Sequence, residues 1–493
     1  MTDDLLAGVE AAAGFAVHGG PAMASRRELV AQGVPGLLAG KDPTLWGTAA
    51  EDRALARLGF LDAFRSSREL LPLIAELREE LGDLSNVVLV GPGLAAASVA
   101  RTLGRPLTVL DDPDPHRVRA LLDDADLLRR TVVLLADARL GSVFWQACRD
   151  LGLTAAEAGR HFVVLGDPLP ELEAAGSVAV PAGTGALGAA TLVPAAFAGV
   201  DVAELINEAE LFAPSLAGEE NNPALALGLA LAAADRVLLV ADGSGLEGLG
   251  EWAADVITGG LGTRVLLAET PQDTDPAPEN TLVVALGGSL SQVAVPGGGV
   301  HPAVAVNGPL GAHFLAWPYA VALAAYVRGV DPFREFPAET ADPAPGSPSF
   351  VEGAVEIFTT GTATDLSTAL RQLLASVDDQ LHVQAFLDRI GDAEIARLRP
   401  LLAAACGRPV SFGWGRYHRG GPLLGSFLQI TGAVTGDVPG PGPDETLGGL
   451  QAARAAGDRQ ALERCGCPLL RLHLTDRTEG IRQLLTAADT LRR

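Results

Sequence analysis

The hydrophobic pattern is clearest at residues 86–112. A β-branched and aliphatic run, Asn86 to Val90, is followed by the turn Gly91-Pro92-Gly93, an alanine-rich segment of helical length and a second apolar run that ends at Asp111. Because parallel strands need a crossover, usually a helix, this order predicts a βαβ unit. A glycine turn before a helix is also a common phosphate-binding place. Residues 94–97 contain no hydroxyl, however, which favours a simple packing helix.

Short apolar runs recur along the chain and leave room for helices between them. A helical arm is predicted over residues 1–82, because apolar positions recur at helical spacing up to Gly82. Another helix is expected around His313 to Arg328. The expected strands are 87–90, 107–110, 131–135, 161–165, 177–180, 236–242, 264–268, 281–286, 351–358, 382–387, 409–414, 426–431 and 469–474.

This order of elements predicts an α/β protein with parallel sheets. The length of 493 residues suggests roughly three domains of about 150 residues. We predict a helical N-terminal arm at 1–82, a first α/β domain at 83–234, a second of similar type at 235–408, and a C-terminal segment at 409–493 that packs on the two domains.

The charge balance excludes several classes of partner. The formal net charge is -24, from 36 basic and 60 acidic residues, and no basic stripe occurs, so neither a nucleic acid nor an anionic membrane is expected. The longest apolar run, Pro223 to Ala234, is well short of the ~20 residues that span a bilayer. The first residues contain no basic region of a signal peptide, so a cytoplasmic protein is expected.

Cysteine and lysine usage limits the available chemistry. The four cysteines are too few for a disulfide framework, and Cys465-Gly-Cys467 has no nearby third and fourth ligand for zinc. We therefore expect no metal site and no cofactor. Lys41 is the single lysine, so any chemistry that needs a lysine elsewhere is excluded.

Several stretches, in order over nearly the whole chain, resemble the bacterial glucose-6-phosphate isomerase family, in the form that also occurs fused to transaldolase. The resemblance implies two sugar-isomerase (SIS) domains and a homodimer. The matching residues are Asp42 to Gly47, Leu192 to Asp201, Asp242 to Gly245 with Trp252, Gly308 to Ala312, Val330 to Phe333, Gly413 to Gly415, Gly420 to Pro422, Phe427 to Thr431, Leu450 to Ala453 and Leu470 to Leu474.

The phosphate-binding motifs of that family are altered. Its loop Ser-Lys-Ser-Gly-Thr-Thr corresponds to Asp137 to Ser142 after the strand at 131–135, which keeps one hydroxyl and adds a carboxylate that would repel phosphate. The arginine of its Gly-Gly-Arg-Tyr-Ser motif corresponds to Gly183, counted back from Leu192-Val-Pro194.

The catalytic base is altered as well. The glutamate that would carry a proton between C1 and C2 through an enediolate corresponds to Gly259, which has no side chain to accept one. The segment Asp331 to Pro337 lacks the lysine that follows it in the family. The loop at Arg416 to Pro422 is about seven residues shorter than the family pattern.

A few residues remain as candidates for a site. His313 lies near the part of the family helix where an acid or base for ring opening would sit, although a packed histidine is commoner. A remnant of the pocket for a sugar phosphate or another anion would use Arg139, Ser142, Thr184 and Thr258. Glu251 and Glu335 are carboxylates that could be recruited as a base, although Glu335 could equally be a loop carboxylate in place of a family glutamine. Glu247 and Glu251 share one helix face, which a solvated surface explains fully.

Three hypotheses follow from the resemblance and the losses. The first is an inactive isomerase-fold protein that serves as a structural or regulatory subunit, at least a homodimer, in a complex with an enzyme of sugar-phosphate metabolism. The second is an active or divergent glucose-6-phosphate isomerase that uses His313 and a carboxylate such as Glu251 or Glu335. The third is a sugar-phosphate sensor that binds through Arg139 and Ser142.

Overall fold

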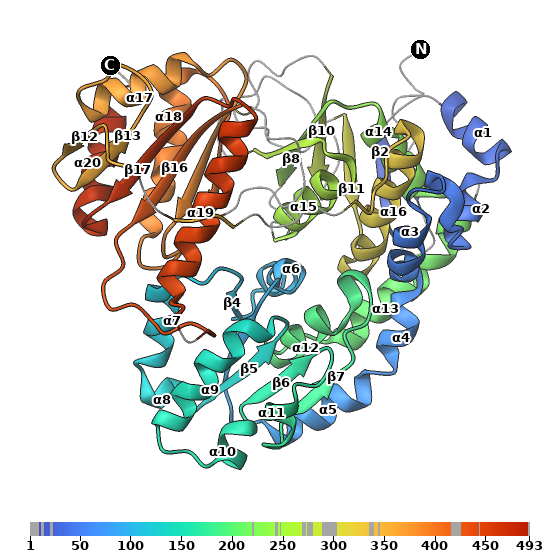
Figure 1. The fold of residues 1–493 in the computed structure, drawn as a ribbon. Coiled ribbons are helices and arrows are strands. Elements are labelled where there is room, and N and C mark those ends of the chain that lie inside the picture. Colours follow the sequence, from blue (N-terminus) through green and yellow to red (C-terminus); the bar gives the residue numbers. More distant parts are fainter. Residues whose placement is uncertain are drawn as a thin grey trace. The chain divides into compact units, whose positions relative to one another are not determined.

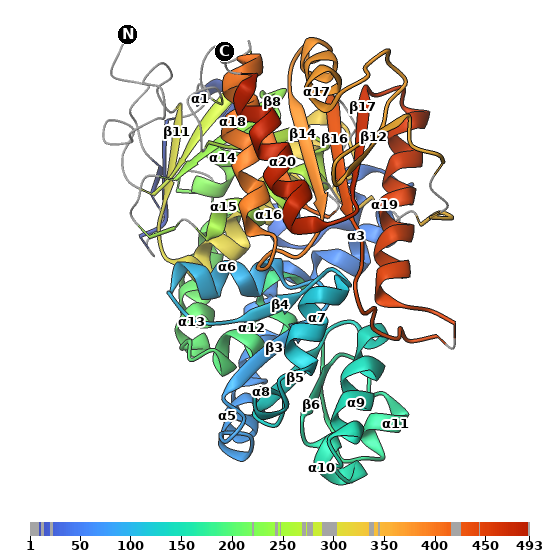
Figure 2. The same ribbon diagram turned by 90° about the vertical axis from the view of Figure 1, so that its left-hand side faces the viewer.

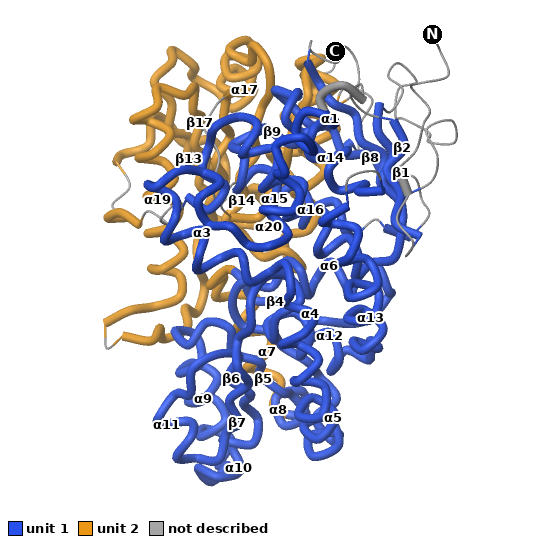
Figure 3. The backbone as a smooth tube through the Cα atoms, turned by 90° about the vertical axis from the view of Figure 1, so that its right-hand side faces the viewer, with its two compact units in different colours: residues 1–111, 126–268, 277–335 blue, residues 112–125, 269–276, 336–493 orange. Residues whose placement is uncertain are grey.

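The structure is a computed structural model that describes residues 9–10, 14–19, 23–218, 221–241, 245–246, 248–268, 273, 280–287, 303–334, 340–343, 346–415, 425–442 and 444–491. The chain divides into two compact units (Figure 3). Unit 1 comprises residues 1–111, 126–268 and 277–335, and unit 2 comprises 112–125, 269–276 and 336–493. Two short segments, 112–125 and 269–276, thus leave unit 1 to become part of unit 2.

The first sheet of unit 1 is entirely parallel, in the order β4-β3-β5-β6-β7. Its strands are apolar almost throughout, as expected for a sheet covered on both faces. They are β3 Asn86–Val90, β4 Thr108–Leu110, β5 Thr131–Leu135, β6 Phe162–Leu165 and β7 Val178–Val180. The associated helices are α6 Leu94–Thr102, α8 Ala125–Leu128, α9 Gly141–Asp150, α10 Ala155–Gly159 and α11 Pro170–Glu173.

The second sheet of unit 1 has the order β1-β2-β11-β10-β8-β9. Four strands are parallel, and β2 and β1 complete the edge in antiparallel pairing. The strands are β1 Val9–Glu10, β2 Ala16–Gly19, β8 Arg236–Ala241, β9 Arg264–Leu267, β10 Thr281–Leu286 and β11 Val304–Asn307. In both sheets the first strand of the parallel set lies between the second and the third.

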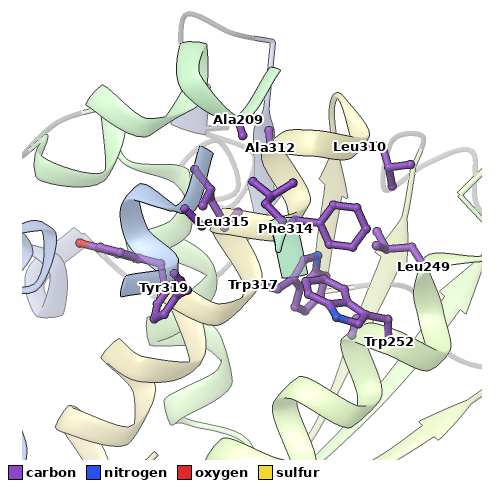
Figure 4. Packing of buried hydrophobic residues seen from close by; sticks show 14 of the residues in the cluster. Ala209, Leu249, Trp252, Leu310, Ala312, Phe314, Leu315, Trp317 and Tyr319 are labelled. Atoms are coloured by element: carbon purple, nitrogen blue, oxygen red, sulfur yellow. The ribbon is translucent and has the colours of Figure 1, made fainter. Parts of the chain in front are cut away.

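Five helices share one large hydrophobic core with both sheets of unit 1. They are α12 Ala189–Phe197, α13 Val202–Phe212, α14 Pro223–Ala232, α15 Leu249–Leu261 and α16 Leu310–Arg328. Figure 4 shows the part of this core around Trp252 and Phe314. The rings of Trp252 on α15 and Phe314 on α16 meet edge to face at 4.7 Å. Among the described residues α16 is the one helix apolar and long enough to cross a membrane, but 83% of it is buried inside the protein, as in a core helix.

The N-terminal segment of unit 1 contains α1 Met23–Ala31, α2 Val34–Ala39, α3 Glu51–Arg57, α4 Ala63–Arg68 and α5 Leu71–Glu80. It also contains β1 and β2, so the prediction of a wholly helical arm needs correction. Val17 of β2 is fully buried and its neighbours pair with β11. A four-residue strand is too short to be recognised from its periodicity. It forms because it pairs with β11 at the edge of the second sheet.

Unit 2 contains a third sheet in the order β12-β13-β17-β16-β14-β15. The last four strands in that order are parallel, and β12 and β13 form an antiparallel hairpin at the other edge. The strands are β12 Phe350–Glu352, β13 Val355–Phe358, β14 Leu381–Phe386, β15 Val410–Trp414, β16 Ser426–Gly432 and β17 Leu469–Leu474. Here too the first parallel strand, β14, lies between the second and the third.

Helices cover both faces of the third sheet (Figure 2). One face packs with α17 Leu366–Ala375, α18 Leu398–Cys406 and α20 Arg477–Thr490 into a second hydrophobic core. On the other face Gln429 of β16 donates from Nε2 to the carbonyl of Ala455 in α19 Leu447–Arg464, at 3.0 Å. The remaining helix of unit 2 is α7 Pro115–Leu122, which comes from the segment 112–125 (Figure 1).

The α/β fold class with parallel sheets is confirmed, but the segments group differently from the predicted boundaries. The strands at 350–386 share one sheet and one core with those at 410–474. Residues 336–408 therefore belong with the C-terminal segment rather than with the strands at 236–307. The reason is long-range pairing: β14 bonds to both β15 and β16, and no local sequence signal marks that choice.

Candidate functional site

The candidate site lies at the carboxyl ends of β3 and β5, where the strand order of the first sheet reverses. In open α/β sheets ligands bind outside the carboxyl ends of the strands at such a point. The turn after β3 is packed tightly against the loop after β5. A Cβ built on Gly91, whose φ is +116°, would lie 2.7 Å from the backbone nitrogen of Asp137. A Cβ on Gly93 would lie 2.5 Å from Leu89 Cδ2. Gly91 is thus required by close approach to the backbone of the neighbouring loop, whereas a side chain at 93 would displace the ends of Leu89 and Val109.

The loop after β5 is capped by its own carboxylate. Asp137 Oδ1 accepts a hydrogen bond from the backbone N–H of Arg139 at 2.9 Å, at the start of the short helix Ala138–Leu140 that leads into α9. The positive end of a helix favours a negative group, and here that group belongs to the chain itself. A phosphate bound at this loop would have to displace Asp137 or lie beside its negative charge.

Arg139 and Ser142 are both exposed on this loop. Ser142 Oγ donates to the carbonyl oxygen of Arg139 at 3.3 Å. Within the described part of the chain, no other hydrogen bond joins two of the four residues Arg139, Ser142, Thr184 and Thr258. The Ser142 hydroxyl is thus engaged in the local turn. Both side chains are exposed to solvent.

Thr184 is exposed, in the turn that follows β7. A Cβ built on Gly59 would lie 3.0 Å from Thr184 Oγ1, so this side chain packs against the N-terminal segment. Gly183, where the resemblance places the arginine of the isomerase family, has a φ of +69° and lies close to Gly188. An L residue at 183 would be strained, so the turn itself now favours glycine.

Thr258 and Gly259 lie in the last turn of α15. Thr258 is 5% exposed and its buried hydroxyl has no hydrogen-bond partner among the described residues. A Cβ at Gly259 would meet nothing within 4 Å. The position at which the resemblance places the catalytic base therefore has space for a side chain, although the sequence supplies none.

Glu251, one of the carboxylates considered as a replacement for the base, forms a bidentate ion pair with Arg101 of α6, at 3.0 and 2.7 Å. The partners are half exposed, and the pair ties α15 to α6 together with the bond from Ser98 Oγ to the carbonyl of Gly248 at 2.6 Å. Glu247 and Glu335, the other two carboxylates, lie outside the described residues, as does the loop at 416–420.

His313 is fully buried in α16. Its Nδ1 accepts a hydrogen bond from Trp317 Nε1 at 3.1 Å, and its ring meets that of Phe15 edge to face at 4.9 Å. Burial lowers the pKa of His313 to about 3, so the ring is neutral at pH 7. These surroundings favour a structural histidine, because the ring has neither the solvent access nor the pKa that a general acid or base needs.

A carboxylate from another helix caps the start of α16, and no pattern in the sequence indicates this contact. Glu208 of α13 accepts a hydrogen bond from the backbone N–H of Gly311 at 2.7 Å. Burial raises the pKa of Glu208, while the bond from Gly311 opposes that rise. A Cβ on Gly311 would lie 2.0 Å from the carbonyl oxygen of Leu205, so α13 approaches closely enough to cap α16. Only the packing of two helices about 100 residues apart reveals this cap.

The described residues include no group of three or more histidine, cysteine, aspartate or glutamate side chains that could hold a metal ion. The four cysteines are free thiols. Burial raises the pKa of Cys148 to about 11, which makes it a core residue rather than a nucleophile.

No protein-family model matches the chain, and no curated protein matches it. Solved structures do. A glucose-6-phosphate isomerase from Chlamydia trachomatis is similar at a TM-score of 0.52 and 12% identity, over 68% of this chain and 88% of that one. A hypothetical protein from Thermus thermophilus is similar at a TM-score of 0.49 and 20% identity, over 63% of this chain and 92% of that one. At these identities the likeness to the isomerase shows a shared fold.

Proposed function

We propose that this protein is a sugar-phosphate-isomerase-like SIS protein without isomerase activity, which acts as a structural or regulatory subunit beside an enzyme of sugar-phosphate metabolism. The observation that carries the proposal is the Asp137 cap. It places a fixed negative charge at the loop where the family resemblance puts the phosphate of the substrate.

Two missing side chains and a second carboxylate cap support the same conclusion. A base is missing at Gly259, and Gly183 takes the place of the arginine that would stabilise developing charge. Glu208 caps the start of α16 in the same way as Asp137 caps its loop. Two helix starts in unit 1 thus bind carboxylates of the chain in places where a helix could otherwise bind an anionic ligand.

The alternative of an active, divergent isomerase needs a base and an acid. Of its described candidates, His313 is buried and neutral, and Glu251 is paired with Arg101. The alternative of a phosphate sensor rests on Arg139 and Ser142, which lie exposed beside Asp137. Neither alternative has a contact in its favour that the first proposal leaves unexplained.

The decisive experiment is a coupled assay of fructose 6-phosphate conversion with purified protein. We expect no turnover above a buffer blank, because loss of the base alone removes roughly 10²- to 10⁴-fold of rate. A commercial glucose-6-phosphate isomerase serves as the positive control. Turnover that disappears in Glu251→Gln but persists in Glu210→Gln, a matched exposed ion-pair glutamate of α13 that pairs with Arg68, would establish the divergent enzyme instead.

Calorimetry with glucose 6-phosphate and with 5-phosphoarabinonate, a mimic of the enediolate, tests the sensor. We expect weak or no binding, since each lost charge-assisted hydrogen bond costs roughly 1.5 to 3 kcal/mol. Micromolar binding that Arg139→Ala abolishes and Arg149→Ala leaves intact would show a sensor at this loop. Arg149 is the control because it is an exposed arginine at the far end of α9.

The proposed assembly is at least a homodimer, and it follows from the family resemblance. Light scattering tests it against the chain mass of 50.6 kDa. A partner that binds the acidic surface would need basic patches, so the amount of partner that the protein captures from native lysate should decrease as salt is added. A concentration-independent monomer that recovers no metabolic enzyme from native lysate would contradict the scaffold role.

A further inference from the structure

The carboxyl edge of the third sheet, in unit 2, is occupied by a segment of the chain from elsewhere in the sequence. The parallel strands lie in the order β15-β14-β16-β17, so the order reverses between β14 and β16. This is the place where open α/β sheets hold their ligands. The occupant is the segment 112–125, which joins β4 to α8 and belongs to unit 2.

Contacts along residues 112–119 follow this edge from strand to strand. A Cβ on Gly415, the residue after β15, would lie 2.5 Å from Asp112 Oδ2. Beyond the end of β16, Arg119 Nη1 donates to the carbonyl oxygens of Thr435 and Gly436, at 2.6 and 2.7 Å. The N–H of Thr435 in turn donates to His116 Nε2 at 3.3 Å.

The centre of the contact is a buried ionic group around Arg477, the first residue of α20 after β17. Arg477 Nη1 donates to Asp114 Oδ2 at 3.3 Å and to Asp392 Oδ2 at 3.0 Å, and Nε donates to the carbonyl of Ala433 at 3.0 Å. Gln451 of α19 donates to the same Asp114 oxygen at 3.0 Å. Asp114 is 2% exposed and Arg477 is 7% exposed, and Nη2 of Arg477 has no partner among the described residues.

Asp114 has two separate roles, one for each carboxylate oxygen. Oδ1 accepts from the N–H groups of His116 and Arg117 and so caps α7. Oδ2 receives the arginine and the glutamine of the third sheet's helices. One oxygen orders the segment, and the other holds it in the crevice. A carboxylate of the chain thus fills the position that an anionic ligand would take beside a buried arginine.

We propose that residues 112–119 are an internal plug of the third-sheet crevice, which the Asp114 carboxylate latches to Arg477 and Gln451 and which opens separately from the strands beneath it. The proposal does not rest on the proposed function, since it concerns unit 2 and involves no sugar phosphate. While the plug is latched, the carboxyl edge of the third sheet is covered by the chain itself.

Hydrogen exchange by mass spectrometry on the full chain tests the plug, with Asp114→Asn as the main variant. Asparagine keeps an oxygen that can cap α7, but it has no negative charge, and its NH₂ group would face the donors of Arg477 and Gln451. We expect exchange at residues 115–122 and 433–437 to become at least tenfold faster, while 426–432 of β16 keep their protection. Asp126→Asn is the matched control, because Asp126 is an exposed aspartate in α8, just beyond the plug.

Gln451→Ala provides a second variant that leaves no buried charge unpaired. It should speed up exchange in the same two segments by a smaller factor. Unchanged protection of 115–122 in both variants would overturn the latch. Faster exchange spread evenly over unit 2 would also overturn the proposal, because the segment would then be part of one cooperative core rather than a plug.

Discussion

The carboxyl edges of the first and third sheets have the same arrangement of their leading strands but are closed by different means. At the first sheet the closure is local: the turn at Gly91 packs on Asp137, and Asp137 caps its own loop. At the third sheet a segment 363 residues before Arg477 supplies the carboxylate that fills the crevice. The carboxyl edge of a sheet can therefore be closed either by a neighbouring loop or by a segment that is remote in the sequence.

The difference also concerns energy. Asp137 is partly exposed, and its bond is that of an ordinary cap, whereas Asp114, Asp392 and Arg477 are taken out of water together. A buried ion pair contributes little net stability, but removal of one member leaves an uncompensated charge. The third-sheet edge should accordingly be more sensitive to single substitutions than the first-sheet edge.

The largest effect is expected for Arg477→Met. The substitution leaves Asp114 and Asp392 buried without their cation and should destabilise unit 2 by about 3 to 5 kcal/mol. Urea midpoints taken from the exchange of unit 2 peptides measure it. Arg482→Met is the control in the same helix, because its side chain is 69% exposed, pairs with Glu479 at the surface and should leave the midpoint nearly unchanged. Equal midpoints for the two variants would contradict the comparison.

The next effect concerns Gly91, the close approach at the first-sheet edge. Gly91→Ala forces a side chain into a left-handed backbone and against Asp137, and we expect a loss of roughly 3 kcal/mol. Gly104 also has a positive φ, of +63°, but open space around its Cβ, so roughly 1 to 2 kcal/mol is expected for Gly104→Ala. Thermal unfolding of both variants isolates the contribution of the contact. A smaller loss at Gly91 than at Gly104 would show that the two loops are not held together.

Asp137→Ala tests the local cap. The loss should be about 1 kcal/mol, as for other N-cap residues, and should leave the exchange of unit 2 unchanged. Asp167→Ala, an exposed aspartate of the same unit, should change stability by under about 0.5 kcal/mol. A loss at Asp137 as large as that of Arg477→Met would mean that the first-sheet edge also depends on a buried charge.

The smallest effect is a pH dependence confined to the plug. Burial, followed by the nearby Arg477 and opposed by Asp114 and Asp392, lowers the pKa of His116, which accepts the Thr435 N–H. The released segment therefore binds a proton more readily than the docked one, and docking weakens as the pH falls through about 6.5. Protection factors of 115–122, corrected for intrinsic exchange, should decrease from pH 7 to 5.5.

His116→Gln keeps an acceptor for Thr435 and should remove this pH dependence. Residues 136–142 contain no histidine, so the loop after β5 serves as the internal reference within the same experiment. A decrease of the same size at both edges would indicate general acid destabilisation and would contradict a specific role of His116.

The sequence by itself determined the fold class, most of the strands, and the altered chemistry of the first-sheet edge. These are local properties: a β-branched run such as 131–135 is a strand because of its own residues, and Asp137 follows it directly. The loss of side chains at Gly183 and Gly259 is what the family resemblance implies, and Gly183 adds a backbone requirement that only its φ reveals.

Tertiary structure alone decided which segments share a sheet and which polar groups meet. The grouping of β14 with β15–β17, the place of β2 beside β11, the cap of α16 by Glu208 and the plug at Asp114 all join residues far apart in sequence. It also placed His313 in the core, although its helix was predicted correctly. Periodicity reports which face of an element is apolar, but the partner of that face depends on packing free energy summed over the whole unit.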